Sequence, residues 1–234
     1  MSVVISSVGC SREVPAYVSP ETDITTIAAA LRGDQPYVVS ILGDSTGNNR
    51  DEWVHLVARR IARTYGRPVT VHDWKTEQDE YTSKVVYDGP GAPVTVWNGS
   101  GSGKSAQYSL QWYAQMAPQQ VDLTIISHSH NHPSDAVNGI EQLVKTAGNN
   151  SVRGGAVVIV LQNPRLDDAA NSQQQAVNKL RELYDNPARG VVLVDVNTAF
   201  RNGDLQALLL PDGAHPNPIG SQLWADTVWK SMQL

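Results

Sequence analysis

The sequence has little cysteine, little positive charge and no long apolar run. Cys10 is the one cysteine among 234 residues, so neither an intrachain disulfide nor a zinc site with paired thiolates can form. Lys and Arg number 18 against 23 Asp and Glu, and the net charge of −5 excludes a general attraction to nucleic acid or anionic lipid. The longest apolar runs, such as residues 156–161, fall far short of the roughly 18 to 20 residues that a membrane span needs. We expect a soluble protein with no membrane insertion and no nucleic-acid partner.

The N-terminal residues lack the features of an export signal. No Lys or Arg precedes their short apolar stretch, and Arg12 and Glu13 interrupt it before a hydrophobic core is complete. The compartment stays open between the cytoplasm and export or virion association by another route. Internal repeats, a P-loop and a dinucleotide-binding fingerprint are missing as well, so the chain is interpreted as one non-repetitive unit.

What the sequence does contain indicates one α/β domain. Hydrophobic residues make up 41% of the chain, with 6 Trp and 8 Tyr, which is enough to bury a core. Unbroken runs rich in Val, Ile and Leu are typical of strands buried on both faces of a parallel sheet. Five such runs predict strands, at residues 37–42, 94–97, 123–127, 156–162 and 191–196. Residues 68–72 form a shorter and weaker candidate.

Stretches with helical spacing alternate with these runs. They predict helices at residues 51–65, 105–116, 134–147, 170–184 and 218–232. The alternation indicates a βαβ series and a three-layer α/β/α sandwich with a central, mainly parallel five-stranded sheet. In such a sheet, ligands bind at the carboxyl ends of the strands. Residues 1–36 contain three prolines and are interpreted as an N-terminal arm or connector, whereas residues 37–234 form the main domain.

A serine follows the first predicted strand. Residues 38–47 read Val-Val-Ser-Ile-Leu-Gly-Asp-Ser-Thr-Gly and lead directly into the first long helix. A serine on a sharp strand-to-helix turn is exposed above the sheet, and its backbone N–H can face a bound oxyanion. Ser45 is therefore a candidate nucleophile. The alternative is an ordinary turn that caps the helix.

A carboxylate and a histidine lie three residues apart before the last predicted helix. A serine hydroxyl is a weak nucleophile at neutral pH and needs an imidazole to take its proton, with a carboxylate to hold that imidazole. Asp212 and His215 are able to supply both groups. The alternative is a Pro-rich loop in which Asp212 caps a turn and His215 is a surface residue.

Taken together, the two ends resemble the SGNH hydrolases, also called GDSL esterases/lipases. The resemblance rests on Gly-Asp-Ser at residues 43–45 and on Asp-Gly-Ala-His-Pro at residues 212–216, and the family's two other sequence blocks are found between them. Residues 98–105 read Asn-Gly-Ser-Gly-Ser-Gly-Lys-Ser, in which Gly103 matches the glycine whose N–H helps to bind the oxyanion. Asn131 matches the asparagine whose side-chain amide is another donor.

The sequence departs from the family pattern at several positions. Thr46 stands where the family motif has leucine, and Ser129 and His132 replace the glycine and the aspartate that flank the asparagine. The glycine-rich block also allows a shift of register, which would make Gly101 the oxyanion donor in place of Gly103.

Three alternating histidines support a second hypothesis. In an extended segment His128, His130 and His132 would project on one face, where three imidazoles are able to hold zinc. A zinc hydrolase is therefore one alternative to the serine mechanism. A non-catalytic glycan-binding or structural protein that retains the fold is the other.

The resemblance implies a serine esterase that acts through an acyl-enzyme. Ser45 attacks the ester carbonyl, His215 takes its proton, and Asp212 orients the imidazole. The N–H groups of Ser45 and Gly103 and the amide of Asn131 bind the oxyanion. This scheme requires neither a metal nor an organic cofactor.

The substrate we expect is a small ester or an acetylated glycan, with O-acetyl groups on a carbohydrate preferred. Asp44, His130, His132 and Asn163 are further candidates for contact with substrate. Residues 1–36 are candidates for attachment to a larger assembly.

Overall fold

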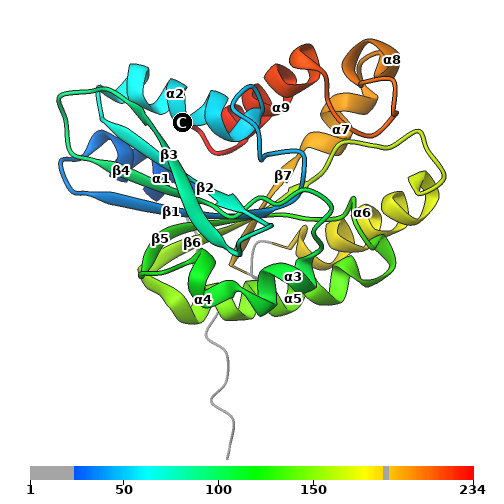
Figure 1. The fold of residues 1–234 in the computed structure, drawn as a ribbon, viewed down its shortest axis with the longest axis horizontal. Helices are drawn as coiled ribbons and strands as arrows, with labels where there is room; N and C mark the ends of the chain where they lie inside the picture. Colours follow the sequence, from blue (N-terminus) through cyan, green and yellow to red (C-terminus); the bar gives the residue numbers. More distant parts are fainter. Residues whose placement is uncertain (1–23, 187–189) are drawn as a thin grey trace, which may run out of the picture.

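A seven-stranded sheet forms the centre of the protein. The computed structural model describes residues 24–186 and 190–234. Within them the strand order is β3-β2-β4-β1-β5-β6-β7, and all neighbouring pairs are parallel except β2 and β3 (Figure 1). The strands are β1 (Tyr37–Gly43), β2 (Val69–Lys75), β3 (Glu80–Tyr87), β4 (Val94–Asn98), β5 (Val121–Ser127), β6 (Ser151–Leu161) and β7 (Val191–Asp195).

The sheet has seven strands, so the five strands predicted from the sequence were too few. The five predicted runs correspond to β1, β4, β5, β6 and β7, and the weak candidate at residues 68–72 becomes part of β2. β3 escaped notice because its residues alternate between exposed and half-buried along an edge of the sheet. An antiparallel edge strand needs no unbroken apolar run, so its sequence lacks the signal on which the prediction relied.

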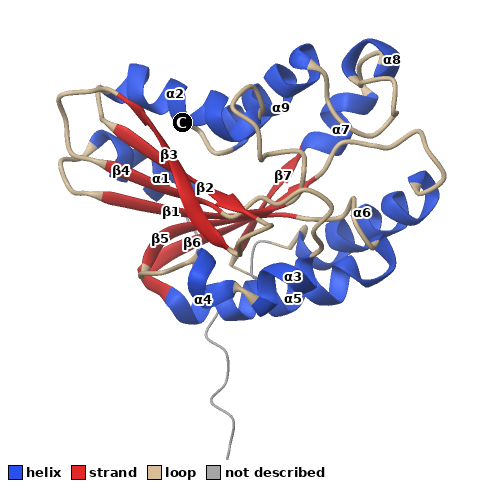
Figure 2. Cartoon of the chain, viewed as in Figure 1, coloured by secondary structure: helices blue, strands red, loops and turns tan. Residues whose placement is uncertain are grey.

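Helices cover both faces of the sheet, which confirms the predicted three-layer α/β/α architecture (Figure 2). One face packs against α1 (Ile24–Arg32), α2 (Trp53–Tyr65), α7 (Val196–Arg201), α8 (Leu205–Leu208) and α9 (Pro218–Ser231). The other face packs against α3 (Ala106–Gln111), α4 (Tyr113–Met116), α5 (Pro133–Asn150) and α6 (Ala170–Tyr184). The single helix predicted over residues 105–116 is divided at Trp112, and the short α7 and α8 were not predicted.

Part of the predicted N-terminal arm packs on the domain. In α1 the side chains of Ile27 and Leu31 are buried in the same apolar core as α2 and α9. Residues 1–23 of the arm lie outside the described residues. Among the described helices, none combines the length and the apolar character required to cross a membrane.

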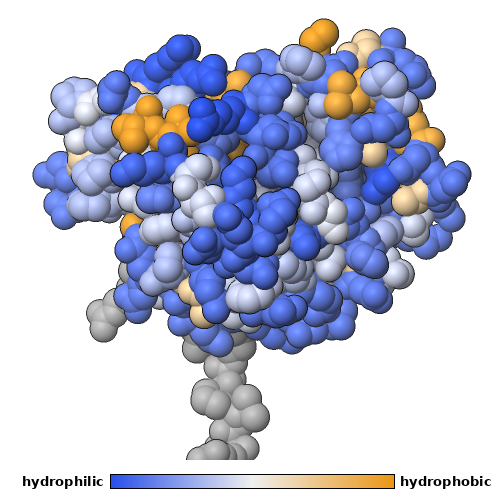
Figure 3. Space-filling view, viewed as in Figure 1, coloured by the Kyte–Doolittle hydropathy of each residue, from blue (hydrophilic) through white to orange (hydrophobic). Residues whose placement is uncertain are grey.

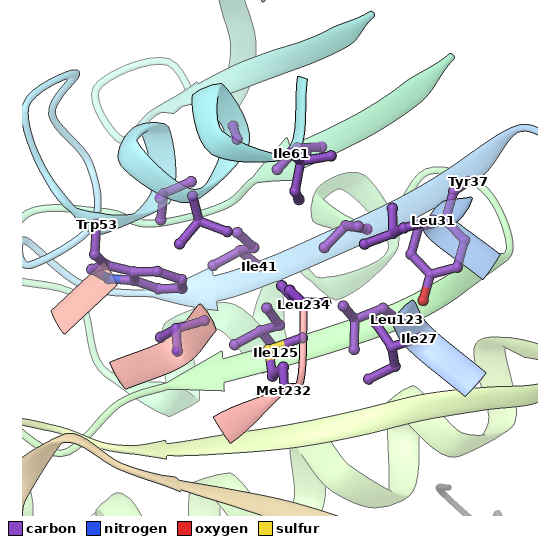
Figure 4. Close-up of a pocket in the computed structure, with 16 residues that line it drawn as sticks. Ile27, Leu31, Tyr37, Ile41, Trp53, Ile61, Leu123, Ile125, Met232 and Leu234 are labelled. Atoms are coloured by element: carbon purple, nitrogen blue, oxygen red, sulfur yellow. The ribbon is translucent and has the colours of Figure 1, made fainter. Parts of the chain in front are cut away.

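The core beneath α1 contains a small apolar cavity (Figure 4). Its volume is about 30 Å³, and its walls include Ile27, Ile41 and Met232. A cavity of this size has little more room than a water molecule occupies. It is therefore a packing defect of the core and too small for a substrate.

The parallel strands bring several chain segments to one edge of the sheet. The last residue of β1, Gly43, lies opposite Ser127 at the end of β5. In the same way Ile41 of β1 pairs with Asn98 at the end of β4. The loops that leave these strands therefore begin side by side, where ligands bind in such sheets.

Candidate active site

Ser45, His215 and Asp212 form one hydrogen-bonded chain. Ser45 is half-buried in the turn after β1, and its Oγ lies 2.8 Å from Nε2 of His215, 170 residues further along the chain. The other ring nitrogen of His215, Nδ1, lies 2.7 Å from Oδ2 of Asp212. A hydroxyl, an imidazole and a carboxylate in this order are the arrangement that activates a serine as a nucleophile.

The carboxylate of Asp212 is held by its own turn. Its Oδ1 accepts the backbone N–H groups of Ala214 at 2.9 Å and His215 at 3.0 Å. Burial raises the pKa of Asp212, but these two bonds and the imidazole of His215 outweigh burial and lower the pKa to about 2. The group is therefore ionised at neutral pH and is able to accept the Nδ1 proton, which leaves Nε2 free to accept the proton of Ser45.

Asp44 shapes the turn that carries Ser45. Its side chain is buried, and Oδ1 accepts the backbone N–H of Thr46 at 3.1 Å and the hydroxyl of Thr46 at 2.9 Å. Its Oδ2 accepts a hydrogen bond from Nε2 of Gln162 at 3.0 Å. In this structure Asp44 therefore contacts the turn, and its predicted contact with substrate stays a prediction.

Gln162, directly after β6, forms hydrogen bonds to the loops that follow β1 and β5. Its Nε2 reaches Asp44 and also donates to the Ser127 carbonyl at 3.2 Å. Its Oε1 accepts the hydroxyl of Ser129 at 3.0 Å and the backbone N–H of His130 at 2.9 Å. In the sequence this residue is marked only as a polar side chain that ends an apolar run.

In the glycine-rich loop after β4, the backbone N–H groups of Gly101 and Gly103 differ in their hydrogen bonding. Gly101 donates its N–H to the Gly43 carbonyl at 3.1 Å, and a Cβ at this position would lie 2.6 Å from Cγ2 of Thr76. Gly103 has a φ of +70°, and its N–H makes no hydrogen bond to any part of the chain that the structure describes. Gly103 is therefore the better candidate for an oxyanion donor, and its role as a donor stays a prediction from the resemblance to the family's glycine block.

Asn131 is connected to the same loop. Its side-chain Nδ2 donates to the carbonyl of Lys104 at 3.1 Å, one residue after Gly103. This bond uses one of the two N–H groups of the amide and leaves the second for a ligand. The oxyanion-binding roles of Ser45, Gly103 and Asn131 stay predictions.

The side chains of the three alternating histidines have different surroundings. β5 ends at Ser127, and the histidines beyond it do not share the expected face, because their side chains have partners in different elements. Nε2 of His128 lies 2.9 Å from Oγ of Ser109, and Nε2 of His130 lies 2.9 Å from the carbonyl of Asn163. His132 is exposed, with a φ of 51° at the start of α5.

Burial keeps two of these histidines neutral. It lowers the pKa of His128 to about 4, and it lowers the pKa of His130 as well. Across residues 24–186 and 190–234, no three His, Cys, Asp or Glu side chains gather as metal ligands. The zinc alternative therefore has no ligand set in this part of the chain.

Asn163 links the loop after β6 to the histidine loop. Its Nδ2 donates to the carbonyl of Ala214 at 2.9 Å, next to His215, while its own carbonyl accepts from His130. The side chains of His130 and Asn163 are both buried. Their contacts here stabilise the loops, and a direct contact of either residue with substrate stays a prediction.

A second histidine–carboxylate pair lies under the nucleophile turn. Nε2 of His55 lies 3.0 Å from Oδ1 of Asp73, and both side chains are buried. Nδ2 of Asn98 donates to the same oxygen at 3.3 Å and to the Gly47 carbonyl at 3.0 Å. Sequence spacing gave no signal for this pair, because one partner lies in α2 and the other in β2.

Apolar side chains are exposed around the histidine loop. Leu166, Leu210 and Ile219 are 44%, 42% and 66% exposed. The backbone N–H of Leu166 donates to the Gly213 carbonyl, and that of Leu210 donates to the His215 carbonyl. Figure 3 shows a mainly hydrophilic surface on which apolar atoms gather in small groups, one of them over α7 and α8.

Comparisons with known proteins identify a family and a common fold. The family model described as GDSL-like Lipase/Acylhydrolase matches residues 32–228. No curated protein sequence matches the chain. A solved structure of a two-domain esterase active on acetylated mannans covers 93% of this chain at 17% sequence identity and a TM-score of 0.64. The match spans 53% of that chain, so the present chain corresponds to about half of the two-domain protein.

Two smaller enzymes match over nearly their whole length. The lipase/acylhydrolase from Enterococcus faecalis has 15% identity and a TM-score of 0.60, with 84% of this chain and 95% of that chain covered. An acetylxylan esterase from Geobacillus stearothermophilus has 14% identity and a TM-score of 0.57, with 86% and 95% covered. At these identities the likeness shows a common fold.

Proposed function

The chain belongs to the GDSL-like lipase/acylhydrolase family, and we propose that it hydrolyses carboxylic esters through an acyl-enzyme on Ser45. The observation that carries the proposal is the chain of two hydrogen bonds, 2.8 Å from Ser45 to His215 and 2.7 Å from His215 to Asp212. Family membership supports a hydrolase, and this chain of bonds supplies a nucleophile with its base already in contact.

The first half of the reaction forms the acyl-enzyme. Ser45 Oγ attacks the ester carbonyl as its proton passes to Nε2 of His215, and Asp212 stabilises the imidazolium that results. The negative oxygen of the tetrahedral intermediate accepts hydrogen bonds from the N–H groups of Ser45 and Gly103 and from the Asn131 amide. Each such donor is worth roughly 3 kcal/mol in measured oxyanion holes. The intermediate then collapses, and His215 returns the proton to the departing alcohol.

Water completes the cycle. His215, neutral again, takes a proton from a water molecule as its oxygen attacks the acyl carbonyl, and the second tetrahedral intermediate releases the carboxylic acid. The proton on His215 then passes back to Ser45 Oγ. No step needs a group that the chain does not supply.

We propose O-acetyl groups on a carbohydrate as the substrate. Two of the structures with this fold are an esterase active on acetylated mannans and an acetylxylan esterase, which supports this choice among the esters that the mechanism admits. The test is acetate release from acetylated mannan and acetylated xylan, with a long-chain p-nitrophenyl ester for comparison. Release of acetate with little cleavage of the long-chain ester supports the proposal, whereas the reverse preference overturns it.

A non-catalytic glycan-binding protein is the alternative. Ser129 and His132 replace the residues that flank the family's asparagine, which is the feature that favours it. Such a protein binds acetylated glycan and leaves every acetyl group in place. Retention of the ligand without acetate release would establish this alternative.

A further inference from the structure

Three arginines gather on one helix of an acidic protein. Arg59, Arg60 and Arg63 lie within five residues of α2, although the chain as a whole carries a net charge of −5. Arg59 and Arg63 line two neighbouring hollows, and Arg60 lines one of them. One, of about 420 Å³, is bounded by Tyr87 and Asp88 at the end of β3, and the other, of about 290 Å³, by Leu56 and by Gln222 of α9. Arg59 and Arg63 take part in both.

Two of these guanidinium groups have no carboxylate partner within residues 24–186 and 190–234. Arg60 forms an ion pair with Asp226 at 2.8 Å and lies 4.3 Å from the centre of the Trp229 ring. Arg59 is half-buried and lies over the Tyr87 ring, at 5.7 Å. Among the residues described by the structure, neither Arg59 nor Arg63 forms an ion pair or a hydrogen bond through its guanidinium group. Their N–H donors are therefore available to a ligand.

The spacing of the two free arginines places like charges together. Residues four apart on a helix are neighbours, and a like-charge pair at this spacing is destabilising. An anion that bridges Arg59 and Arg63 would remove this repulsion. The planar fork of arginine fits a carboxylate or a phosphate through two parallel hydrogen bonds.

The same helix face leads from the arginines to the catalytic residues. Glu52, Leu56, Arg59 and Arg63 recur at helical spacing, and Glu52 lies near enough to His215 for their charges to interact. On the neighbouring helix, Ile219 and Gln222 follow within seven residues of His215. A helix rises about 1.5 Å per residue, so the arginines begin about 10 Å from Glu52 and end about 16 Å from it.

We propose that the two hollows along α2, which Arg59 and Arg63 share, bind an anionic stretch of a polysaccharide whose ester lies at Ser45. The ligand is a glycan with carboxylate groups, which Arg59 and Arg63 hold while the chain extends toward His215. This inference rests on the proposed esterase function for the position of the ester. The binding of the anion stands by itself, because it requires no reaction.

Binding is tested by calorimetry with an oligogalacturonate that carries no ester. Wild type binds it, and binding weakens as salt is raised from 50 to 200 mM. The double variant Arg59→Gln/Arg63→Gln loses at least tenfold in affinity. The matched variant Lys145→Gln/Lys179→Gln removes the same charge from α5 and α6 on the other face of the sheet, and it binds like wild type. Equal affinity in both double variants overturns the proposal.

Two further ligands exclude other anions. A DNA oligonucleotide and inorganic polyphosphate of matched charge bind at least tenfold more weakly than oligogalacturonate. Binding of either one in place of the glycan overturns the proposal.

Activity then separates this inference from the esterase proposal. The Arg59→Gln/Arg63→Gln variant hydrolyses p-nitrophenyl acetate within twofold of wild type, and its KM for acetylated polygalacturonate rises about tenfold. If the esterase proposal alone is wrong, no protein cleaves p-nitrophenyl acetate while the difference in oligogalacturonate binding persists. If the proposal of anion binding alone is wrong, ester cleavage persists, and wild type and the Arg59→Gln/Arg63→Gln variant bind oligogalacturonate equally.

Discussion

The carboxylate of Asp212 forms hydrogen bonds to both the side chain and the backbone of His215. Its Oδ2 lies 2.7 Å from the imidazole Nδ1, and its Oδ1 accepts the backbone N–H of the same histidine at 3.0 Å. The loop thus fixes the direction of the ring as well as its position. Because the pKa of Asp212 is lowered to about 2, the carboxylate keeps this role throughout the neutral range.

The variant Asp212→Asn tests this arrangement. The amide is able to keep the backbone contacts, but its NH2 group favours the wrong tautomer of His215, so kcat falls by roughly 1,000-fold or more. KM changes little, since Asp212 does not touch the substrate. Steady-state kinetics on a soluble ester, with circular dichroism as the control for folding, measure the effect. A kcat within threefold of wild type would show that Asp212 does not orient the histidine.

Asn131→Ala removes one predicted oxyanion donor. We expect kcat to fall by about 100-fold with KM nearly unchanged, because the lost bond forms in the transition state. The exposed Ser134→Ala, in the first turn of α5, is the matched control and keeps wild-type kinetics. A loss confined to KM would place Asn131 in substrate binding instead.

Gln162→Met tests the contacts that join the loops. Methionine keeps the size of the side chain but leaves the buried partners at Asp44 and His130 without their hydrogen bonds. We expect the free energy of unfolding to fall by about 3 kcal/mol, together with kcat, because the turn of Ser45 loses its support. Urea unfolding measures the change, and the exposed Gln142→Met is expected to stay within about 0.5 kcal/mol of wild type. Full stability in Gln162→Met would contradict this account.

Because His128 is buried, we expect the free energy of unfolding to depend on pH. Burial lowers its pKa from 6.5 to about 4, so the unfolded chain binds the proton more readily than the folded protein. The stability that neutral His128 allows is fully present above pH 6.5 and is lost as the pH falls toward 4, by roughly 3 kcal/mol in total. The lowered pKa of His130 acts in the same direction.

Urea unfolding between pH 7 and pH 5 checks this prediction. Wild type loses stability over this range, and His128→Gln loses about 2 kcal/mol less, since one titrating group is gone. Parallel pH profiles for the two proteins would show that His128 is not the group that limits stability in acid.

The sequence was sufficient to predict the strands with unbroken apolar runs and the candidate site residues that directly follow such a run. Ser45 comes after β1 and Asn131 after β5, and the parallel order of the strands brings their loops to one edge. Asp212 and His215 could be paired because they share one turn. Spacing along the chain was sufficient in each of these cases.

Other features depend on contacts that no local pattern records. β3 is an edge strand with alternating exposure, and its antiparallel pairing with β2 becomes visible only in the sheet. The buried pair of His55 and Asp73 joins a helix to a strand. The three histidines after β5 were expected to share a face only if the segment beyond residue 127 stayed extended, and the sequence does not show that His128 and His130 have partners in different loops and helices.

The most direct test of the central claim is hydrolysis of p-nitrophenyl acetate by wild type and by Ser45→Ala, each with and without a chelator. The account predicts turnover by wild type that the chelator leaves unchanged, and a loss of about 10,000-fold or more in kcat for the variant with its fold intact. Undiminished turnover by Ser45→Ala, or loss of wild-type activity to the chelator, would contradict a serine mechanism.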